Sequence, residues 1–282
     1  MHAFDNTDNR IFRQENKLQR CLQTRHIGKR VMWFKKLSST QDFAKCFILD
    51  NGISVADGYV IISNSQHNGL GRFGNRWISP EGGIWLSIIL RSGLHPSRIM
   101  LFSYCASVAV SEAVERCTGI QSRLKWPNDI LIGGRKVSGI LVDASVETES
   151  IENLVIGIGI NANVNAAQIE GRLGDTNHPY PITSLQEQLG GSCDKFNLIR
   201  LFLQIFDELY SEIEADNTYP ILDKWKKRAE PIISKSVQIS CGKEQYSAKV
   251  VDLEEDGSLV VLRQGYQIER IVSSDYHVHV IG

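Results

Sequence analysis

A run rich in glycine and arginine follows an apolar, strand-like segment near residue 60. Residues 66–77 read Gln-His-Asn-Gly-Leu-Gly-Arg-Phe-Gly-Asn-Arg-Trp and come directly after the apolar residues 58–63. Glycines let the backbone turn tightly and approach a ligand closely. Arginines supply forked donors for phosphate or carboxylate groups, and a tryptophan supplies a flat face for a ring. The run therefore predicts a loop that binds a nucleotide or an activated acyl phosphate.

The same loop contains a partial match to the dinucleotide-binding pattern. Gly69, Gly71 and Gly74 fit G-x-G-x-x-G after a strand. That pattern requires a helix directly after it and an acidic residue about 20 positions further on. Residues 75–80 are poor helix formers, and no acidic residue lies between Glu81 and Glu112. These two failures argue against a dinucleotide-binding fold.

Two further segments have residue types suited to a nucleotide. Residues 125–129 read Lys-Trp-Pro-Asn-Asp, and residues 157–161 read Gly-Ile-Gly-Ile-Asn. Lys125 on its own would be taken for a surface lysine, but Trp126 and Pro127 would stiffen the strand end and hold its ammonium in place. The alternating glycines leave one strand face bare, which indicates either a close approach by another group or plain packing. No Walker A, H-E-x-x-H or G-x-S-x-G pattern is present.

The composition does not indicate a charged binding partner, a redox function or a membrane-spanning segment. The 282 residues carry a net charge of −1, so no general attraction to nucleic acid or membrane follows. The six cysteines are scattered without a C-x-x-C pair, which favours free thiols in a reducing compartment. No apolar run reaches the length of a membrane span and no signal peptide is visible. We therefore expect a soluble, cytoplasmic protein.

Hydrophobic periodicity and turn residues predict alternating strands and helices. Ser39 with Asp42 resembles a capping box at the start of a helix. Gly133-Gly134 between two apolar runs predicts a tight hairpin. We expect strands at 31–34, 58–63, 83–91 and 154–161, and the apolar runs that meet in this hairpin at 123–132 and 135–143. We expect helices at 38–49, 96–117, 182–189, 197–214 and 219–228, and a loop over 165–184.

These elements predict three parts of the chain. Residues 1–30 form a basic extension, because nine basic residues and one acid, Glu15, lie between Arg10 and Lys36. Both a solvated arm or helix and an arm that contacts an acidic protein or nucleic acid fit this pattern. Residues 31–231 form the main domain. Residues 232–282, with four or five short alternating strands, form a small barrel.

Taken together, the motifs resemble those of the biotin protein ligases. The similarity covers residues 31–282 and keeps the family's order and spacing. The matching residues are Ser39-Thr-Gln41, Gln66 with Gly69 to Trp77, Lys125 to Asp129, Lys136 with Gly139 to Val142, and Gly157 to Asn161.

The resemblance implies an α+β fold, in which a mixed sheet flanked by helices is followed by an SH3-like barrel. The main domain would be similar to class II aminoacyl-tRNA synthetases and lipoate ligases. The implied reaction has two steps. The biotin carboxylate attacks the α-phosphate of ATP, with Mg²⁺, to give biotinyl-5′-AMP and pyrophosphate. A lysine of a biotin carboxyl carrier protein then attacks this mixed anhydride.

The resemblance also implies roles for individual residues. Lys125 would bridge the biotin carboxylate and the α-phosphate, and Arg72 would be the second catalytic cation. Ser39, Thr40 and Gln66 would hydrogen-bond the biotin head group, and Leu70, Gly71 and Arg72 would close over it. Trp77 would stack near adenine and Asn161 would bond its edge. Gln41 and Gly69 join the biotin-binding set, and Asn128 joins the ATP-binding set with Arg72 and Lys125. The Mg²⁺ ligands and a homodimeric state stay open.

The chain departs from the family pattern in two places. Leu70 stands where the family commonly has the first arginine of Gly-Arg-Gly-Arg, which makes the loop less polar. The bifunctional members carry an N-terminal DNA-binding domain, whereas residues 1–30 are too few for one. We therefore expect no sequence-specific DNA binding, and we expect that residues 1–28 can be deleted without loss of adenylate synthesis.

Two alternative functions stay open. One is a lipoate or octanoate ligase or transferase of the same fold, and the other is a biotin-sensing regulator that binds nucleic acid.

Overall fold

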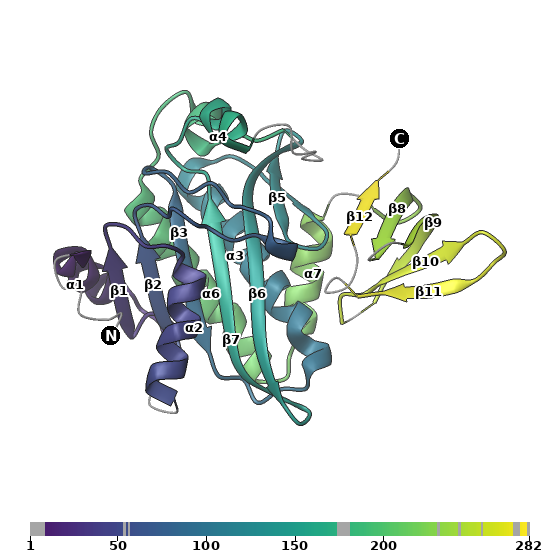
Figure 1. Ribbon diagram of the computed structural model, residues 1–282, viewed down its shortest axis with the longest axis horizontal. Helices are drawn as coiled ribbons and strands as arrows, with labels where there is room; N and C mark the ends of the chain where they lie inside the picture. The colour runs from purple at the N-terminus through teal and green to yellow at the C-terminus, as the bar shows by residue number, and fades with distance from the viewer. Residues whose placement is uncertain are drawn as a thin grey trace.

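A seven-stranded sheet forms the centre of the larger part of the chain (Figure 1). The computed structural model describes residues 9–52, 55, 57–173, 181–229, 232–241, 244–254, 256–272 and 277–280. The strand order is β1-β2-β3-β7-β6-β5-β4; β1 and β2 run parallel and the other pairs are antiparallel. The strands are β1 (Arg30–Phe34), β2 (Tyr59–Ser63), β3 (Ile84–Leu90), β4 (Arg123–Lys125), β5 (Asp129–Ile132), β6 (Arg135–Glu147) and β7 (Ser150–Ile160).

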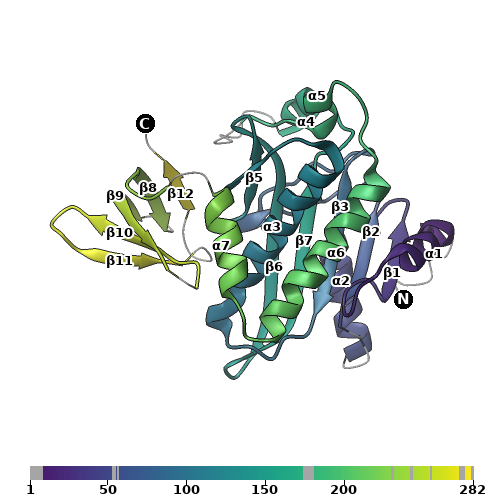
Figure 2. The ribbon, with the colours of Figure 1, turned by 180° about the vertical axis from the view of Figure 1, so that it is seen from behind.

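Helices cover the two faces of this sheet unequally. The long helices α3 (Ile99–Thr118) and α6 (Lys195–Glu214) cross one face together with α7 (Tyr219–Arg228), as Figure 2 shows. Every residue of α3 from Met100 to Val114 is buried, which fits a helix that is apolar on nearly all sides. The opposite face carries α2 (Thr40–Asn51) over β3 and β7. This face is therefore only partly covered by helix.

The N-terminal segment is part of the folded core. Helix α1 (Phe12–Cys21) packs against β1, and Leu18 and Ile27 have no exposed surface. The buried Glu15 pairs with Arg10 at 2.8 Å and accepts the Trp33 backbone N–H. The sequence predicted a solvated arm or helix and a dispensable one. Residues 12–21 do form a helix, and most of its side chains are exposed. The structure argues against the second expectation, because deleting residues 9–30 would remove core side chains.

One carboxylate of α6 fixes the turn between α1 and β1. Asp207 is 5 % exposed and accepts three backbone N–H groups, from Arg25, His26 and Ile27, at 2.7, 2.7 and 2.8 Å. Backbone donors that lose a buried partner are costly. The contact joins two segments about 180 residues apart in the sequence, which no local pattern indicates.

The C-terminal strands form a second, five-stranded antiparallel sheet in the order β11-β10-β9-β8-β12. This is the small β domain that the sequence predicted. Its buried side chains join the core of the main domain, and one of its carbonyls accepts two hydrogen bonds from that domain: Gly257 O accepts the Tyr104 hydroxyl at 2.7 Å and the Trp126 indole N–H at 3.0 Å. The strands are β8 (Ser236–Cys241), β9 (Glu244–Leu253), β10 (Leu259–Arg263), β11 (Ile268–Ile271) and β12 (His277–Val280).

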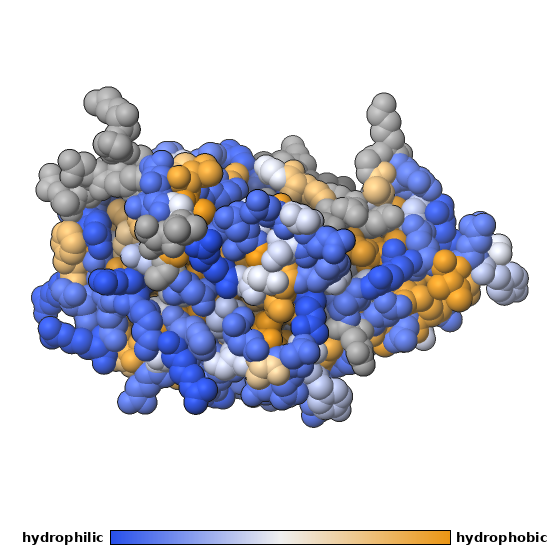
Figure 3. Space-filling view, turned by 90° about the horizontal axis from the view of Figure 1, so that it is seen from below, coloured by the Kyte–Doolittle hydropathy of each residue, from blue (hydrophilic) through white to orange (hydrophobic). Residues whose placement is uncertain are grey.

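The face seen from below is largely hydrophilic, with several smaller apolar patches (Figure 3). In the view from below, an orange patch lies at the right-hand end, over the small β domain (Figure 3). Ile268, which is 72 % exposed, is one of the apolar side chains of this domain that reach the surface. Among the described residues, no helix has both the length and the apolar character that a membrane span requires.

The segment 165–184 contains helical structure that the sequence did not indicate. Helix α4 (Ala166–Leu173) is capped by Asn165, whose side chain accepts the Gln168 N–H at 3.1 Å. Helix α5 (Leu185–Leu189) starts three residues later than expected, after its cap Ser184. The glycines and prolines of this segment had favoured a loop, and they do not interrupt residues 166–173. Pro231, which the sequence suggests as the residue that closes the helix expected at 219–228, lies outside the described residues.

We predict that Asp207→Ala lowers the free energy of unfolding by about 3–5 kcal/mol, because three buried N–H groups lose their charged acceptor. Urea unfolding followed by circular dichroism measures this loss. Glu208→Ala, at the exposed neighbouring position of α6, is the matched control and should change stability by less than about 0.5 kcal/mol. Equal stability of the two variants would contradict the anchoring role of Asp207.

Candidate active site

A cavity of about 440 Å³ lies on the sheet face that α2 covers only in part. Its walls come from the start of α2, the glycine-rich loop, β4, β5 and the middle of β6 and β7. Of the twelve residues that the sequence predicted for the site, all but Gly69 line this one cavity. They are Ser39, Thr40, Gln41, Gln66, Leu70, Gly71, Arg72, Trp77, Lys125, Asn128 and Asn161.

The glycine-rich loop folds back on itself as an irregular hairpin. Bridges pair Gln66 with Ser79 and Leu70 with Arg76, and Trp77 N–H donates to Gly69 O at 2.9 Å. Gly69 lies inside this hairpin, where an added Cβ would approach the Trp77 carbonyl oxygen to 2.4 Å. Gly69 therefore shapes the loop from within and does not line the cavity. No helix follows the glycines beyond the single turn Arg72–Gly74, as the failed dinucleotide pattern indicated.

Hydroxyl and amide groups gather where α2 begins. Ser39 caps the helix by accepting the Asp42 N–H at 3.3 Å, as its spacing predicted. The next residue, Thr40, donates its backbone N–H to the side chain of Gln66 at 2.7 Å. Because the Gln66 amide nitrogen also donates to Ser79 at 2.8 Å, Gln66 fastens the loop to the start of α2. This end of the cavity offers neutral donors and acceptors.

The indole of Trp77 lies on a floor that lacks side chains. Gly139 of β6 and Gly159 of β7 face each other in register, and Trp77 covers both. A Cβ on Gly159 would approach the indole nitrogen to 2.4 Å, and one on Gly139 would meet the ring at 3.2 Å. The alternating glycines of β7 thus admit a close approach by another group. Trp77 Nε1 is buried without a hydrogen-bond partner among the described residues, so its N–H is an unsatisfied donor at the wall of the cavity.

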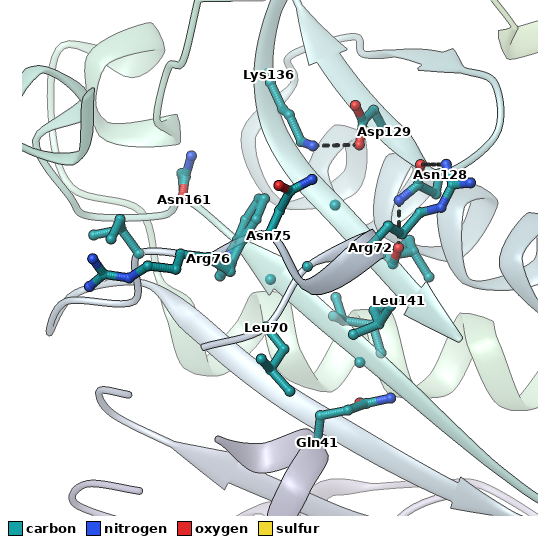
Figure 4. Close-up of a pocket in the computed structure, with 18 of the residues that line it drawn as sticks. Gln41, Leu70, Arg72, Asn75, Arg76, Asn128, Asp129, Lys136, Leu141 and Asn161 are labelled. Carbon is teal, nitrogen blue, oxygen red and sulfur yellow. Dashed lines mark hydrogen bonds and ion pairs between the residues drawn. The ribbon is translucent and has the colours of Figure 1, made fainter. Parts of the chain in front are cut away.

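The charged side chains of Arg72, Asp129 and Lys136 lie at the other end of the cavity, as Figure 4 shows. Arg72 points toward Asn128, whose side-chain oxygen accepts from it at 3.3 Å. Burial lowers the pKa of Arg72, and the charge of Asp129 opposes that effect. Lys136 pairs with Asp129 at 2.6 Å, and its ammonium stands 5.2 Å from the centre of the Trp77 ring. This end suits a polyanion better than a neutral ligand.

Lys125 and Asn161 are both largely buried at the cavity wall. Lys125 ends β4 beside Trp126 and is 8 % exposed, which is rare for a lysine. Asn161 follows β7, is 2 % exposed and donates its side-chain amide to Thr183 O at 3.1 Å. That bond fixes the amide orientation, so the oxygen of Asn161 is the group free to accept a further donor.

Several lining residues were absent from the predicted site. Lys136 belonged to a matching motif, but its pairing with Asp129 depends on the β5–β6 register. Period-two alternation from Gly139 would have identified Leu141 on the same face. Nothing in the sequence indicated the apolar cavity wall that α4 forms, because this segment was predicted to be a loop. The additional lining residues include Phe73, Asn75, Arg76, Asp129, Lys136, Gly139, Leu141, Gly157, Gly159, Ile169, Leu173, Ile182 and Val278.

We predict that Gly159→Ala displaces the Trp77 indole and lowers the free energy of unfolding by about 1–3 kcal/mol, the usual cost of overpacking. Near-ultraviolet circular dichroism should change along with stability. Gly171→Ala is the matched control, since nothing lies within 4 Å of its added Cβ and helix α4 favours alanine. An unchanged aromatic signal in Gly159→Ala would contradict the packing of Trp77 on this floor.

Comparisons with known proteins agree with this geometry. Residues 33–161 match the model of the Biotin/lipoate A/B protein ligase family. The bifunctional ligase/repressor BirA of Bacillus subtilis is 30 % identical over 262 residues, covering 93 % of this chain and 78 % of that protein. The biotin–[acetyl-CoA-carboxylase] ligase of Paracoccus denitrificans is 29 % identical over 184 residues, covering 62 % of this chain and 74 % of that protein.

A solved structure supports the same assignment. The biotin protein ligase of Aquifex aeolicus, in complex with biotin and ATP, superposes with a TM-score of 0.71 at 26 % identity, covering 90 % of this chain and all of that one. The predicted α+β fold, with a mixed sheet and a small C-terminal β domain, is confirmed. The sequence, the fold and the arrangement of the cavity therefore show that this chain belongs to the biotin protein ligase family.

Proposed function

We propose that this enzyme attaches biotin to a lysine of a biotin carboxyl carrier protein, using ATP and passing through biotinyl-5′-AMP. The observation that carries the proposal is the composition of one cavity. It joins a neutral hydrogen-bonding end at the start of α2, a buried lysine at the end of β4, and a flat indole on a glycine floor. The relatives support it, since their names specify biotin, ATP and acetyl-CoA carboxylase.

In the first step, a carboxylate oxygen of biotin attacks the α-phosphorus of ATP, and the bond to pyrophosphate breaks. Negative charge increases around the α-phosphate, so positioned cations stabilise the transition state more than the ground state. We assign this role to Lys125 and Arg72. Ser39, Thr40, Gln41 and Gln66 hold the biotin head group at the neutral end. Trp77 and the oxygen of Asn161 receive adenine, whose exocyclic amine can donate to that oxygen.

In the second step, the neutral amine of the carrier lysine attacks the acyl carbon of biotinyl-5′-AMP. The bond to the phosphate oxygen breaks, AMP leaves, and the nitrogen loses a proton to solvent as the amide forms. A mixed anhydride must be kept from water until the carrier arrives. The hairpin of residues 66–79 lies over the cavity, and Leu70 faces it. We assign the protection of the intermediate to this hairpin, acting as a lid.

The donor set of the cavity fits Mg²⁺ held mainly by substrate. Mg²⁺ sites in nucleotide enzymes commonly use one or two carboxylates together with phosphate oxygens. Among the described lining residues, Asp129 is the only carboxylate, and it lies beside Arg72 and Lys136. We propose that Asp129 would hold the ion, which would neutralise phosphate charge.

We also propose a division of the chain and a setting for its activity. The catalytic unit begins before α1, because Leu18 and Ile27 belong to the core of the main sheet. The small β domain forms the second unit. We keep the proposal of a cytoplasmic enzyme that does not bind DNA in a sequence-specific way. The packing of α1 against β1 supports the second part, the lack of sequence-specific DNA binding, since this helix is used in the fold of the catalytic unit.

A direct assay tests the function. The protein is incubated with biotin, ATP, Mg²⁺ and a biotin carrier domain, and the carrier is then probed with streptavidin and weighed by mass spectrometry. We expect a biotinyl adduct on one lysine, and none when ATP is omitted. Parallel reactions contain lipoate or octanoate. Lipoyl or octanoyl addition without biotinyl addition would show that the enzyme serves another acyl substrate.

We predict that Lys125→Ala lowers the rate of biotinyl-5′-AMP formation on the order of 10²-fold or more, the scale of losing one positioned electrostatic group. Pyrophosphate release in single-turnover reactions measures this step without a carrier. Lys226→Ala, at an exposed position of α7, is the control and should form the adenylate at the wild-type rate. A normal rate in Lys125→Ala would remove Lys125 from the mechanism.

A further inference from the structure

A chain of polar contacts leads from the protein surface to the neutral end of the cavity. It begins with Lys45 of α2 and Asp143 of β6, whose side chains are 43 % and 36 % exposed and meet at 2.8 Å. Neither residue lines the cavity. The oxygen of Asp143 that accepts from Lys45 also accepts from the amide nitrogen of Gln41, at 3.2 Å. Gln41 does line the cavity, one helical turn before Lys45.

These contacts fix the orientation of the Gln41 amide. Its nitrogen donates to Asp143 and to Val155 O at 2.9 Å, and both of these partners can only accept. The amide oxygen must therefore point the other way, over Gly157, where an added Cβ would approach it to 2.5 Å. An amide oxygen has no proton, so any partner on this side of Gln41 has to donate.

The hydroxyl of Ser87 is the next member of the chain. It lies 3.0 Å from the Gln41 oxygen and 2.9 Å from the hydroxyl oxygen of Thr40, in a fully buried position on β3. Ser87 has one proton to share between these neighbours. Because Gln41 can only accept, that proton satisfies Gln41, and Thr40 then donates its own proton to Ser87. The lone pair that Thr40 keeps is an acceptor, and Thr40 lines the cavity.

We propose that Asp143 and Lys45, outside the cavity, are positioning residues that make Thr40 a hydrogen-bond acceptor toward the substrate. The proposal rests on the proposed function, and it specifies the substrate group that Thr40 meets as an N–H, which the ureido ring of biotin supplies. Gln41 lies at the opposite end of the view from Lys136 and Asp129 (Figure 4). Changes at Asp143 should therefore affect biotin and leave ATP unaffected.

The test measures the KM values for biotin and ATP, and kcat, in adenylate formation. Asp143→Ala removes one of the two acceptors of the Gln41 amide nitrogen and leaves only Val155 O, so the orientation of the amide is held less firmly. The KM for biotin should rise roughly tenfold, as for one misdirected buried hydrogen bond, while kcat and the KM for ATP stay within twofold. Asp143→Asn keeps one oxygen for both contacts and should restore the KM for biotin to within threefold of wild type. Asp223→Ala, which breaks another surface ion pair, is the matched control.

A double-mutant cycle separates this role from general destabilisation. If Asp143 acts through the hydroxyl of Thr40, adding Asp143→Ala to Thr40→Val should change the KM for biotin by less than twofold. A tenfold effect in both backgrounds, a parallel rise in the KM for ATP, or equal behaviour of Asp143→Ala and Asp223→Ala would overturn the proposal. These outcomes leave the function intact when the wild type forms biotinyl-5′-AMP; a wild type that forms none overturns both.

Discussion

The bare glycine floor beneath Trp77 is the constraint on which the site depends. An indole can lie flat on a sheet only where the strands below it lack side chains, and Gly139 and Gly159 meet this condition because β6 and β7 pair in the matching register. A slip of one residue would bring the flanking isoleucines under the ring. The register also places Gly157 under Gln41, so the same strand pairing accommodates both ends of the cavity.

The elements around this floor are held by contacts between distant parts of the chain. Gln66 connects the glycine-rich loop to the start of α2, and Asp207 fastens the turn before β1 to α6. Both use a side-chain oxygen to satisfy backbone N–H groups that would otherwise be buried without partners. The cavity is thus built on a rigid sheet, while its cover is a short hairpin held by few backbone bonds.

Features governed by local patterns could be predicted from the sequence. The apolar periodicity of α3, the cap at Ser39 and the turn at Gly133-Gly134 all appear where they were expected. The motifs predicted twelve site residues, and all of them except Gly69 line one cavity, although what each of them binds stays a prediction. Features that depend on distant contacts could not be predicted. The basic composition of residues 1–30 gave no sign that Leu18 packs in the core. The glycines and prolines of residues 165–184 predicted a loop where α4 forms, and no pattern indicated that Val278 of β12 reaches the cavity.

The carbonyl of Gly257 has a consequence for how the molecule unfolds. Tyr104 of the main helical layer and Trp126, next to Lys125, both donate to it, and both of their side chains are almost fully buried. Separating the small sheet from the large one would exchange these hydrogen bonds for water and expose apolar side chains of both sheets, which belong to one hydrophobic core. The two sheets therefore share one cooperative unit, and thermal denaturation of the chain should follow a single transition in which the segment around Lys125 loses its order together with the C-terminal strands.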